Sequence, residues 1–306
     1  MLLDAGADPS ARTDTGSTPI VIAAERRQWD MVSMLVAAGA DPSARSTDGT
    51  TPLFFANLET VVALLEKGAD AAAKCDDGMT PLHACVSHAV ASRLLDAGAD
   101  ATARSIDGFT PLHSCAWRAD VGTSRILLDA GADPSARSND ATTPLHRAAE
   151  NKSGEVVRLL LGAGADATCA NNEGVTPLHS AVQHRSKVVV ALLLAAGADP
   201  SAADNDGETP LHHAMRIRRD DPYQQEFFEE VRLLLRAGAD VSLQNSEGAT
   251  PLHCAVGAAC RTSSKNAVRM LLDAGADAEV KDNEGETPSD AALDVETFGE
   301  RTVSHI

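Results

Sequence analysis

Aromatic side chains are scarce in this sequence. Its 306 residues include two Trp, one Tyr and six Phe. Large aromatic side chains usually dominate the buried apolar area of a core, so here the core must be built from Ala, Leu and Val. Such a composition favours helices that pack closely through small residues.

Basic residues are also in short supply. Lys and Arg total 26 against 44 Asp and Glu, which gives a formal net charge of −18. An acidic chain is poorly suited to sequence-independent binding of DNA or RNA, because such binding displaces counterions with Lys and Arg. It is equally unsuited to an anionic membrane surface. We therefore expect no nucleic-acid partner and no membrane partner.

Targeting segments are missing from the sequence as well. No apolar run reaches the roughly 20 residues that cross a bilayer. Residues 1–6 have neither a basic start nor a long apolar run, so they do not resemble a secretory signal. The sequence thus predicts an intracellular protein, cytoplasmic or nuclear.

The sequence does contain an internal repeat. Thr-Pro recurs at positions 18, 51, 80, 110, 143, 176, 209, 250 and 287, and Gly-Ala-Asp recurs in the same register from position 6 to position 275. A period of about 33 residues is the signature of a repeat array. We divide residues 1–293 into a partial N-terminal repeat (1–17), eight Thr-Pro to Gly-Ala-Asp units (18–278) and a C-terminal half-repeat cap (279–293), followed by a short tail (294–306).

Each unit predicts two helices joined by a turn. Thr is a favoured N-cap, and Pro is favoured at the first helical position, where its missing N–H costs nothing. A second helix follows with apolar spacing, as in residues 156–161, and the Gly of Gly-Ala-Asp ends it in a left-handed cap. Turn-forming residues such as 170–174 then form a finger that leads to the next Thr-Pro.

Thr-Pro-Leu-His stands intact at residues 80–83, 110–113, 143–146, 176–179, 209–212 and 250–253. On these motifs and their period, nearly the whole chain resembles the ankyrin-repeat family. The resemblance implies an all-α solenoid, which is a stack of helix–turn–helix units with β-hairpin fingers. It also implies a concave surface of fingers and first helices that binds a protein partner. Val21 and Phe54 replace the motif His, and residues 287–290 read Thr-Pro-Ser-Asp.

Several units depart from the usual length. The units that begin at Thr51 and Thr80 are four and three residues short, which is about one helical turn. We expect shortened helices at the helix–helix turn there, with the stack unbroken. The units that begin at Thr209 and Thr250 gain eight and four residues at the same turn.

The larger insertion allows two interpretations. Asp221 and Pro222 predict an N-cap and a first helical residue, and Phe227, Val231 and Leu234 share one helical face. The second helix of this unit would then gain about two turns. The alternative is a solvated loop. A basic run precedes it and is either a solvated surface or a functional patch: Arg216, Arg218 and Arg219.

No arrangement of residues predicts catalysis or metal binding. The resemblance assigns each motif His to a structural hydrogen-bond network. The remaining histidines, His88, His184, His213 and His305, have no Cys or carboxylate cluster at ligand spacing. No phosphate-binding loop, dinucleotide fingerprint or nucleophile elbow occurs. We therefore expect no enzyme activity, no catalytic residue, no cofactor and no metal.

The six cysteines are expected to be reduced structural thiols. Cys85 and Cys115 occupy the same register in neighbouring repeats. Stacked helices lie about 8–10 Å apart, which is too far for a disulfide. Cys75 and Cys169 fall in finger segments and are expected to be more exposed.

Three functions are compatible with this sequence. The leading hypothesis is a monomeric, non-catalytic scaffold that binds a protein partner. The first alternative is the ankyrin segment of a larger protein, such as a ubiquitin-ligase adaptor, an enzyme or a channel, because the chain begins inside a repeat. The second alternative is a microbial effector directed at a host.

The fingers carry a row of acidic residues. These are Asp14, Asp48, Asp76, Asp77, Asp107, Asp140, Glu173, Asp206 and Glu247. Stacked fingers would align them in an acidic ridge, which favours a partner with a basic segment. The alternative is that the acids serve solubility only.

Large side chains gather in residues 79–118, where we expect the binding hot spot. Positions that the resemblance assigns to the groove are mostly polar elsewhere in the chain. Here they are Met79, Ile106, Phe109, Trp117 and Arg118. Trp and Arg are enriched in hot spots, and exposed apolar patches mark contact surfaces. The alternative is packing, with Phe109 and Ile106 between fingers and Trp117 over the first helix.

Overall fold

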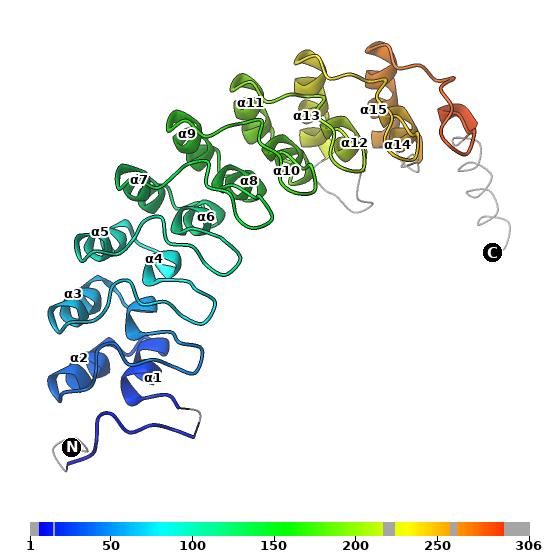
Figure 1. Ribbon diagram of the computed structural model, residues 1–306. Helices are drawn as coiled ribbons and strands as arrows, with labels where there is room; N and C mark the ends of the chain where they lie inside the picture. Colours follow the sequence, from blue (N-terminus) through cyan, green and yellow to red (C-terminus); the bar gives the residue numbers. More distant parts are fainter. Residues whose placement is uncertain (1–5, 15, 217–223, 258–261, 291–306) are drawn as a thin grey trace. The chain divides into compact units, whose positions relative to one another are not determined.

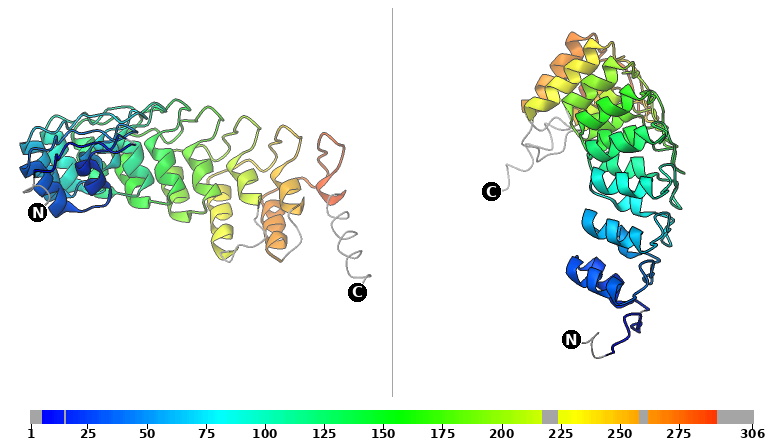
Figure 2. Two further views of the ribbon diagram at one scale, coloured as in Figure 1. Left: turned by 90° about the horizontal axis from the view of Figure 1, so that it is seen from below. Right: turned by 90° about the vertical axis from the view of Figure 1, so that its left-hand side faces the viewer.

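The chain folds into pairs of helices, one pair for each Thr-Pro unit (Figure 1). The computed structural model describes residues 6–14, 16–216, 224–257 and 262–290. The chain divides into two compact units, Met1–Arg147 with Gly162–Ala165, and Ala148–Leu161 with Asp166–Ile306. Within each unit the fingers project from the same side of the helices (Figure 2).

The first helices of the pairs each begin at the Pro of Thr-Pro. They are α1 (Pro19–Glu25), the 3-10 helix η1 (Pro52–Phe54), α4 (Pro81–Ala84), α6 (Pro111–Trp117), α8 (Pro144–Glu150), α10 (Pro177–Gln183), α12 (Pro210–Met215) and α14 (Pro251–Gly257). The second helices are α2 (Trp29–Ala37), α3 (Leu58–Glu66), α5 (His88–Asp96), α7 (Val121–Asp129), α9 (Gly154–Gly162), α11 (Lys187–Ala195), α13 (Gln224–Arg236) and α15 (Thr262–Asp273).

The helices form two rows in each unit. In the first unit α1, η1, α4 and α6 pack in succession, and so do α2, α3, α5 and α7. In the second unit α10, α12 and α14 form one row, and α11, α13 and α15 form the other. The core lies between the rows. The Leu of Thr-Pro-Leu-His is fully buried, as in Leu112, and so are second-helix leucines such as Leu94 and Leu127.

A buried histidine ties several of the first helices to the following finger. His113 Nδ1 accepts hydrogen bonds from the backbone N–H of Thr110 (3.1 Å) and from its hydroxyl (2.9 Å). The opposite nitrogen, Nε2, donates to the carbonyl oxygen of Thr142, 3.0 Å away. The ring therefore caps its own helix and binds the next repeat, as the resemblance implied. His83, His179, His212 and His253 make the same pair of contacts.

Repeats that lack the histidine show what it contributes. Val21 and Phe54 cannot accept a hydrogen bond, and the buried hydroxyls of Thr18 and Thr51 have no hydrogen-bond partner among the described residues. In the final copy Asp290 takes over the role. Its Oδ2 accepts from the backbone N–H and the hydroxyl of Thr287, at 3.0 and 2.8 Å.

The repeat units of unusual length differ from the others in the lengths of their helices. η1 has three residues and α4 has four, against seven in α6. Shortened helices were predicted at the helix–helix turn, and the structure shows that it is the first helix of each pair that is short. α13 has 13 residues against nine in α11. This described part is longer by about one turn, and the upstream segment, which would hold the rest of the predicted two-turn extension, lies outside the described residues. Val231 and Leu234 lie on its buried face. The predicted N-cap at Asp221 and the basic residues Arg218 and Arg219 lie outside the described residues, as do the Phe227 side chain and the tail, residues 294–306.

The fingers are hydrogen-bonded turns, and no strand occurs in the described residues. The β-hairpin expectation is therefore not met. Each finger is closed by two backbone bonds at its tip, as from Ser105 N–H to the Phe109 carbonyl (2.9 Å) and from Gly108 N–H to the Ser105 carbonyl (2.9 Å). This is too short a ladder for a strand pair. Adjacent fingers are also linked, since Ile106 N–H donates to the Asp77 carbonyl (2.8 Å).

Cys75 corrects one prediction about exposure. Its side chain is buried, although it lies in a finger, whereas Cys169 is half-buried. Cys75 occupies the finger position that holds Ser105 in the next repeat, and its backbone N–H closes the finger on the Met79 carbonyl (2.9 Å). Burial raises the pKa of Cys85 to about 12 and that of Cys115 to about 11.

No described helix is both long enough and apolar enough to cross a bilayer.

Candidate partner-binding groove

A hollow of about 450 Å³ opens between the fingers and the first helices of the first unit. Its finger side is lined by Asp77, Met79, Ser105, Asp107 and Phe109, and its helix side by His113, Ser114, Trp117, Arg118 and Arg147. Six of the twelve residues that the sequence singled out as partner-binding therefore lie together. They come from two consecutive fingers and from α6, which stands beside them.

The floor of the hollow is apolar and accessible. Trp117 is 50% exposed and Met79 is 38% exposed, and Phe109 is half-buried. Phe109 meets the ring of His113 edge-on, with ring centroids 5.4 Å apart. The guanidinium of Arg147 lies 4.8 Å from the centroid of Phe109 and 5.7 Å from that of Trp117. Such cation–π contacts orient the arginine over both rings.

The sequence did not single out Arg147, although its register points to the groove. It directly follows the motif His of its repeat, at the position that Ser114 occupies one repeat earlier. Ser114 lines the same hollow. An alignment of the repeats by register would therefore have placed Arg147 beside Trp117. The contact of its guanidinium with aromatic rings also requires Phe109 and Trp117, which have no counterparts in the other repeats.

Arg118 has a structural task at the shortened helix. Its guanidinium reaches back one repeat and donates to the carbonyl oxygens of His83 (3.1 Å) and Cys85 (2.8 Å). α4 ends at Ala84, and the last carbonyls of a helix have no partner within the helix. The arginine therefore supplies donors at the place where the deleted turn would have continued the helix.

The acidic residues of the finger tips fall into two groups. Asp48 accepts hydrogen bonds from the hydroxyls of Ser46 and Thr50. The bond from Ser46 is the main cause that lowers the pKa of Asp48 below its usual value. Asp140 is held in the same way by Ser138 and Thr142. The exposed Asp77 and Asp107 make no side-chain hydrogen bond or ion pair within the described part of the chain.

The remaining predicted residues lie outside this hollow. Ile106 is 66% exposed at the finger surface. Asp76 lies 3.8 Å from the guanidinium of Arg45. Glu173 and Asp206 are exposed at finger tips of the second unit.

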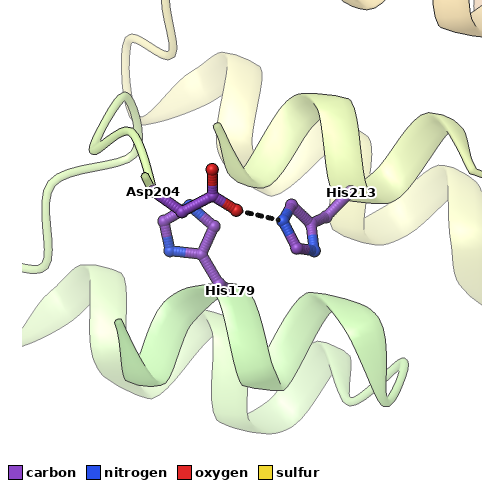
Figure 3. Close-up of side chains that lie close together, drawn as sticks. All are labelled: His179, Asp204 and His213. Carbon is purple, nitrogen blue, oxygen red and sulfur yellow. Dashed lines mark hydrogen bonds and ion pairs between the residues drawn. The ribbon is translucent and has the colours of Figure 1, made fainter. Parts of the chain in front are cut away.

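The second unit contains a polar cluster that joins His179, Asp204 and His213 (Figure 3). His213 Nε2 lies 3.0 Å from Asp204 Oδ2 and 3.6 Å from an oxygen of the buried Glu208. The other oxygen of Glu208 pairs with Arg216. We expected no carboxylate cluster near His213, and this is wrong, because the finger and α12 fold back and bring residues nine positions apart together.

Most ligand atoms of this cluster are already engaged. His179 Nδ1 accepts from Thr176 N–H (3.1 Å), and Nε2 donates to the Glu208 carbonyl (3.1 Å). Asp204 Oδ1 accepts two backbone N–H groups of its finger, from Asp206 and Glu208. Burial raises the pKa of Asp204, but the hydrogen bonds from His213 and from these N–H groups bring it below its usual value. The arrangement is therefore a hydrogen-bonded ion-pair network that closes a finger onto its first helix.

The comparisons with known proteins agree with the repeat geometry. A family model described as ankyrin repeats in three copies matches residues 1–74, 55–138, 125–204, 145–222 and 223–296. A comparison with curated proteins gave no match. Matched segments cover nearly all of the chain, and in the structure they hold helix pairs that begin at Thr-Pro and are followed by fingers. The chain is therefore a member of the ankyrin-repeat family.

Proposed function

We propose that this chain binds a protein partner through the hollow lined by Met79, Phe109 and Trp117, and that the bound segment is basic. Ankyrin repeats are generally protein–protein interaction modules and typically non-catalytic. The observation that carries the proposal is the accessible apolar floor beside the carboxylates of Asp77 and Asp107, which are unpaired within the described part of the chain.

The physical argument combines burial and charge. A half-exposed Trp and an exposed Met gain free energy when a partner covers them, at about 25 cal/mol per Å² of apolar surface. Large aromatic side chains in a concave site dominate such interfaces. The carboxylates of Asp77 and Asp107 attract a basic segment and favour its orientation, and this attraction weakens as salt increases.

The test combines a selection with a matched pair of variants. Peptides selected from a random phage-displayed library would be synthesised, and their affinities measured by calorimetry for the parent chain, Trp117→Ala and Met34→Ala. Met34 is a suitable control because it is 59% exposed on α2, outside the hollow. We expect Trp117→Ala to weaken binding by about 30-fold or more, with little change in Tm. Met34→Ala should bind like the parent.

Two results would contradict the proposal. One is selected peptides that are acidic or that bind Trp117→Ala as tightly as the parent. The other is a loss of about 3–5 kcal/mol in the stability of Trp117→Ala with affinity retained, which would assign Trp117 to packing. The monomeric state and the intracellular setting stay predictions.

A further inference from the structure

Asp77 and Asp107 are available for a partner for the same reason that the floor of the hollow is apolar. Thr50 and Thr142 follow the tip glycine or alanine of their fingers, and their hydroxyls donate to Asp48 (2.9 Å) and Asp140 (3.0 Å). In the two fingers between them, this position holds Met79 and Phe109. These side chains have no donor to offer the tip carboxylate. The serine that also donates to Asp48 and Asp140 is replaced by Cys75 in the first of these fingers, and in the second it is Ser105, whose hydroxyl oxygen accepts from the Phe109 N–H (3.0 Å). Within the described residues, Asp77 and Asp107 therefore lack the hydroxyl donors that hold the other two carboxylates, and Met79 and Phe109 form the apolar surface between them.

The two carboxylates are spaced by one repeat. They belong to the same position of consecutive fingers, and the backbone bond from Ile106 to Asp77 ties these fingers together. Helices of successive repeats pack about 8–10 Å apart, so we take a similar spacing for the carboxylates. A polyproline-II segment rises about 3.1 Å per residue and has three residues per turn, so every third side chain points the same way about 9 Å further on. A β-strand returns to the same face after about 6.6 Å, which is too short.

The aromatic rings favour an apolar contact over a third cation. Arg147 already lies over Phe109 and Trp117, at 4.8 and 5.7 Å from their centroids. A basic side chain of the partner would meet the like charge of Arg147 there, which is unfavourable. The partner's cations are therefore directed to Asp77 and Asp107, and the side chain between them contacts the rings.

We propose, on the basis of the function proposed above, that the hollow recognises an extended, polyproline-II-like segment with two basic residues three positions apart. An aliphatic residue lies between them. One basic residue pairs with Asp77 and the other with Asp107, while the aliphatic side chain covers Met79 and Trp117.

The experiment uses labelled synthetic peptides of one composition. Two Arg residues are placed about two, three or four positions apart around a central Leu, and a fourth peptide has Arg in place of that Leu. Fluorescence anisotropy with the full chain gives the Kd of each. We expect the three-position peptide to bind about fivefold more tightly than the other spacings, and the peptide with a central Arg to bind more weakly than its Leu counterpart.

Matched charge variants assign the effect to the two carboxylates. Asp77→Asn and Asp107→Asn should each remove most of the preference for the three-position peptide. Asp76→Asn removes the same charge from the same finger, but Asp76 lies beside Arg45, so this variant should keep the preference.

The outcomes separate the two proposals. Equal affinity for all three spacings, or an equal effect of Asp76→Asn and Asp77→Asn, would overturn the spacing inference and leave the basic-partner proposal standing. If no basic peptide binds in a way that depends on Trp117, both proposals are overturned.

Discussion

Mild acid should destabilise this fold through its buried histidines. Burial lowers the pKa of His113 to about 4, and that of His179 to about 4, where the nearby His213 adds to the effect. The unfolded rings titrate near 6.5. Below that pH the unfolded chain binds more protons than the folded chain, so stability is complete above about pH 6.5 and is lost as the pH falls towards about 4.

The size of the loss follows from these values. A ring with a pKa of about 4 in the folded chain and about 6.5 in the unfolded chain costs about 1.8 kcal/mol between about pH 7 and about pH 5. His113 lies in the first unit and His179 in the second, so each unit should show a loss of this size. Burial also lowers the pKa values of His83 and His212, which adds to the loss in the same direction.

Two measurements check this prediction. Urea unfolding followed by circular dichroism at several pH values gives the loss of stability, and an NMR titration gives the pKa of His113 in the folded chain. His113→Asn is the control, because its pH dependence should be smaller than the parent's by about 1.8 kcal/mol. A folded chain in which His113 titrates near 6.5 would refute the reasoning. Carboxylates do not interfere strongly, because unfolded Asp residues bind protons only below about pH 5.

Three further substitutions test separate features, each by urea unfolding. Val21→His should give the buried threonine hydroxyl of its repeat the missing partner and raise stability by about 1 kcal/mol; no gain would show that the ring does not fit. Arg118→Ala should lower stability by about 1–2 kcal/mol, because the carbonyls at the end of α4 lose two donors, and an unchanged stability would exclude the capping role. Gly108→Ala should cost more than Gly131→Ala: both have positive φ (81° and 88°), but only at Gly108 would the new Cβ come within 2.9 Å of the next finger's backbone. Equal costs would contradict this steric argument.

The repeat architecture could be predicted because its signals are local. Thr110 and Pro111 define a helix start through capping and a fixed φ, and His113 follows at the position that completes the cap. The Gly of Gly-Ala-Asp supplies a positive φ, as at Gly131. Each of these effects acts within a few residues, so the sequence specifies it directly.

Contacts between repeats were harder to predict because they depend on the reach of individual side chains. Arg118 appeared as a hot-spot residue, yet its guanidinium caps a helix of the preceding repeat. His213 appeared isolated, yet Asp204 lies 3.0 Å away across a finger. Arg147 was not noticed at all. The repeat period places the backbones of neighbouring units, but it does not reveal which rotamer a long side chain adopts between them.

The forward reach of the motif histidine gives the array a direction. His113 Nε2–H needs the carbonyl of Thr142 in the following finger, and His253 Nε2–H needs that of Glu286. A chain cut after a second helix would leave the Nε2–H of the final histidine without its acceptor. Removing repeats from the N-terminal side leaves every remaining histidine with its acceptor, because each ring donates to the following finger. Anyone who shortens this protein should therefore place the new C-terminus beyond a complete finger, so that the last ring keeps its acceptor.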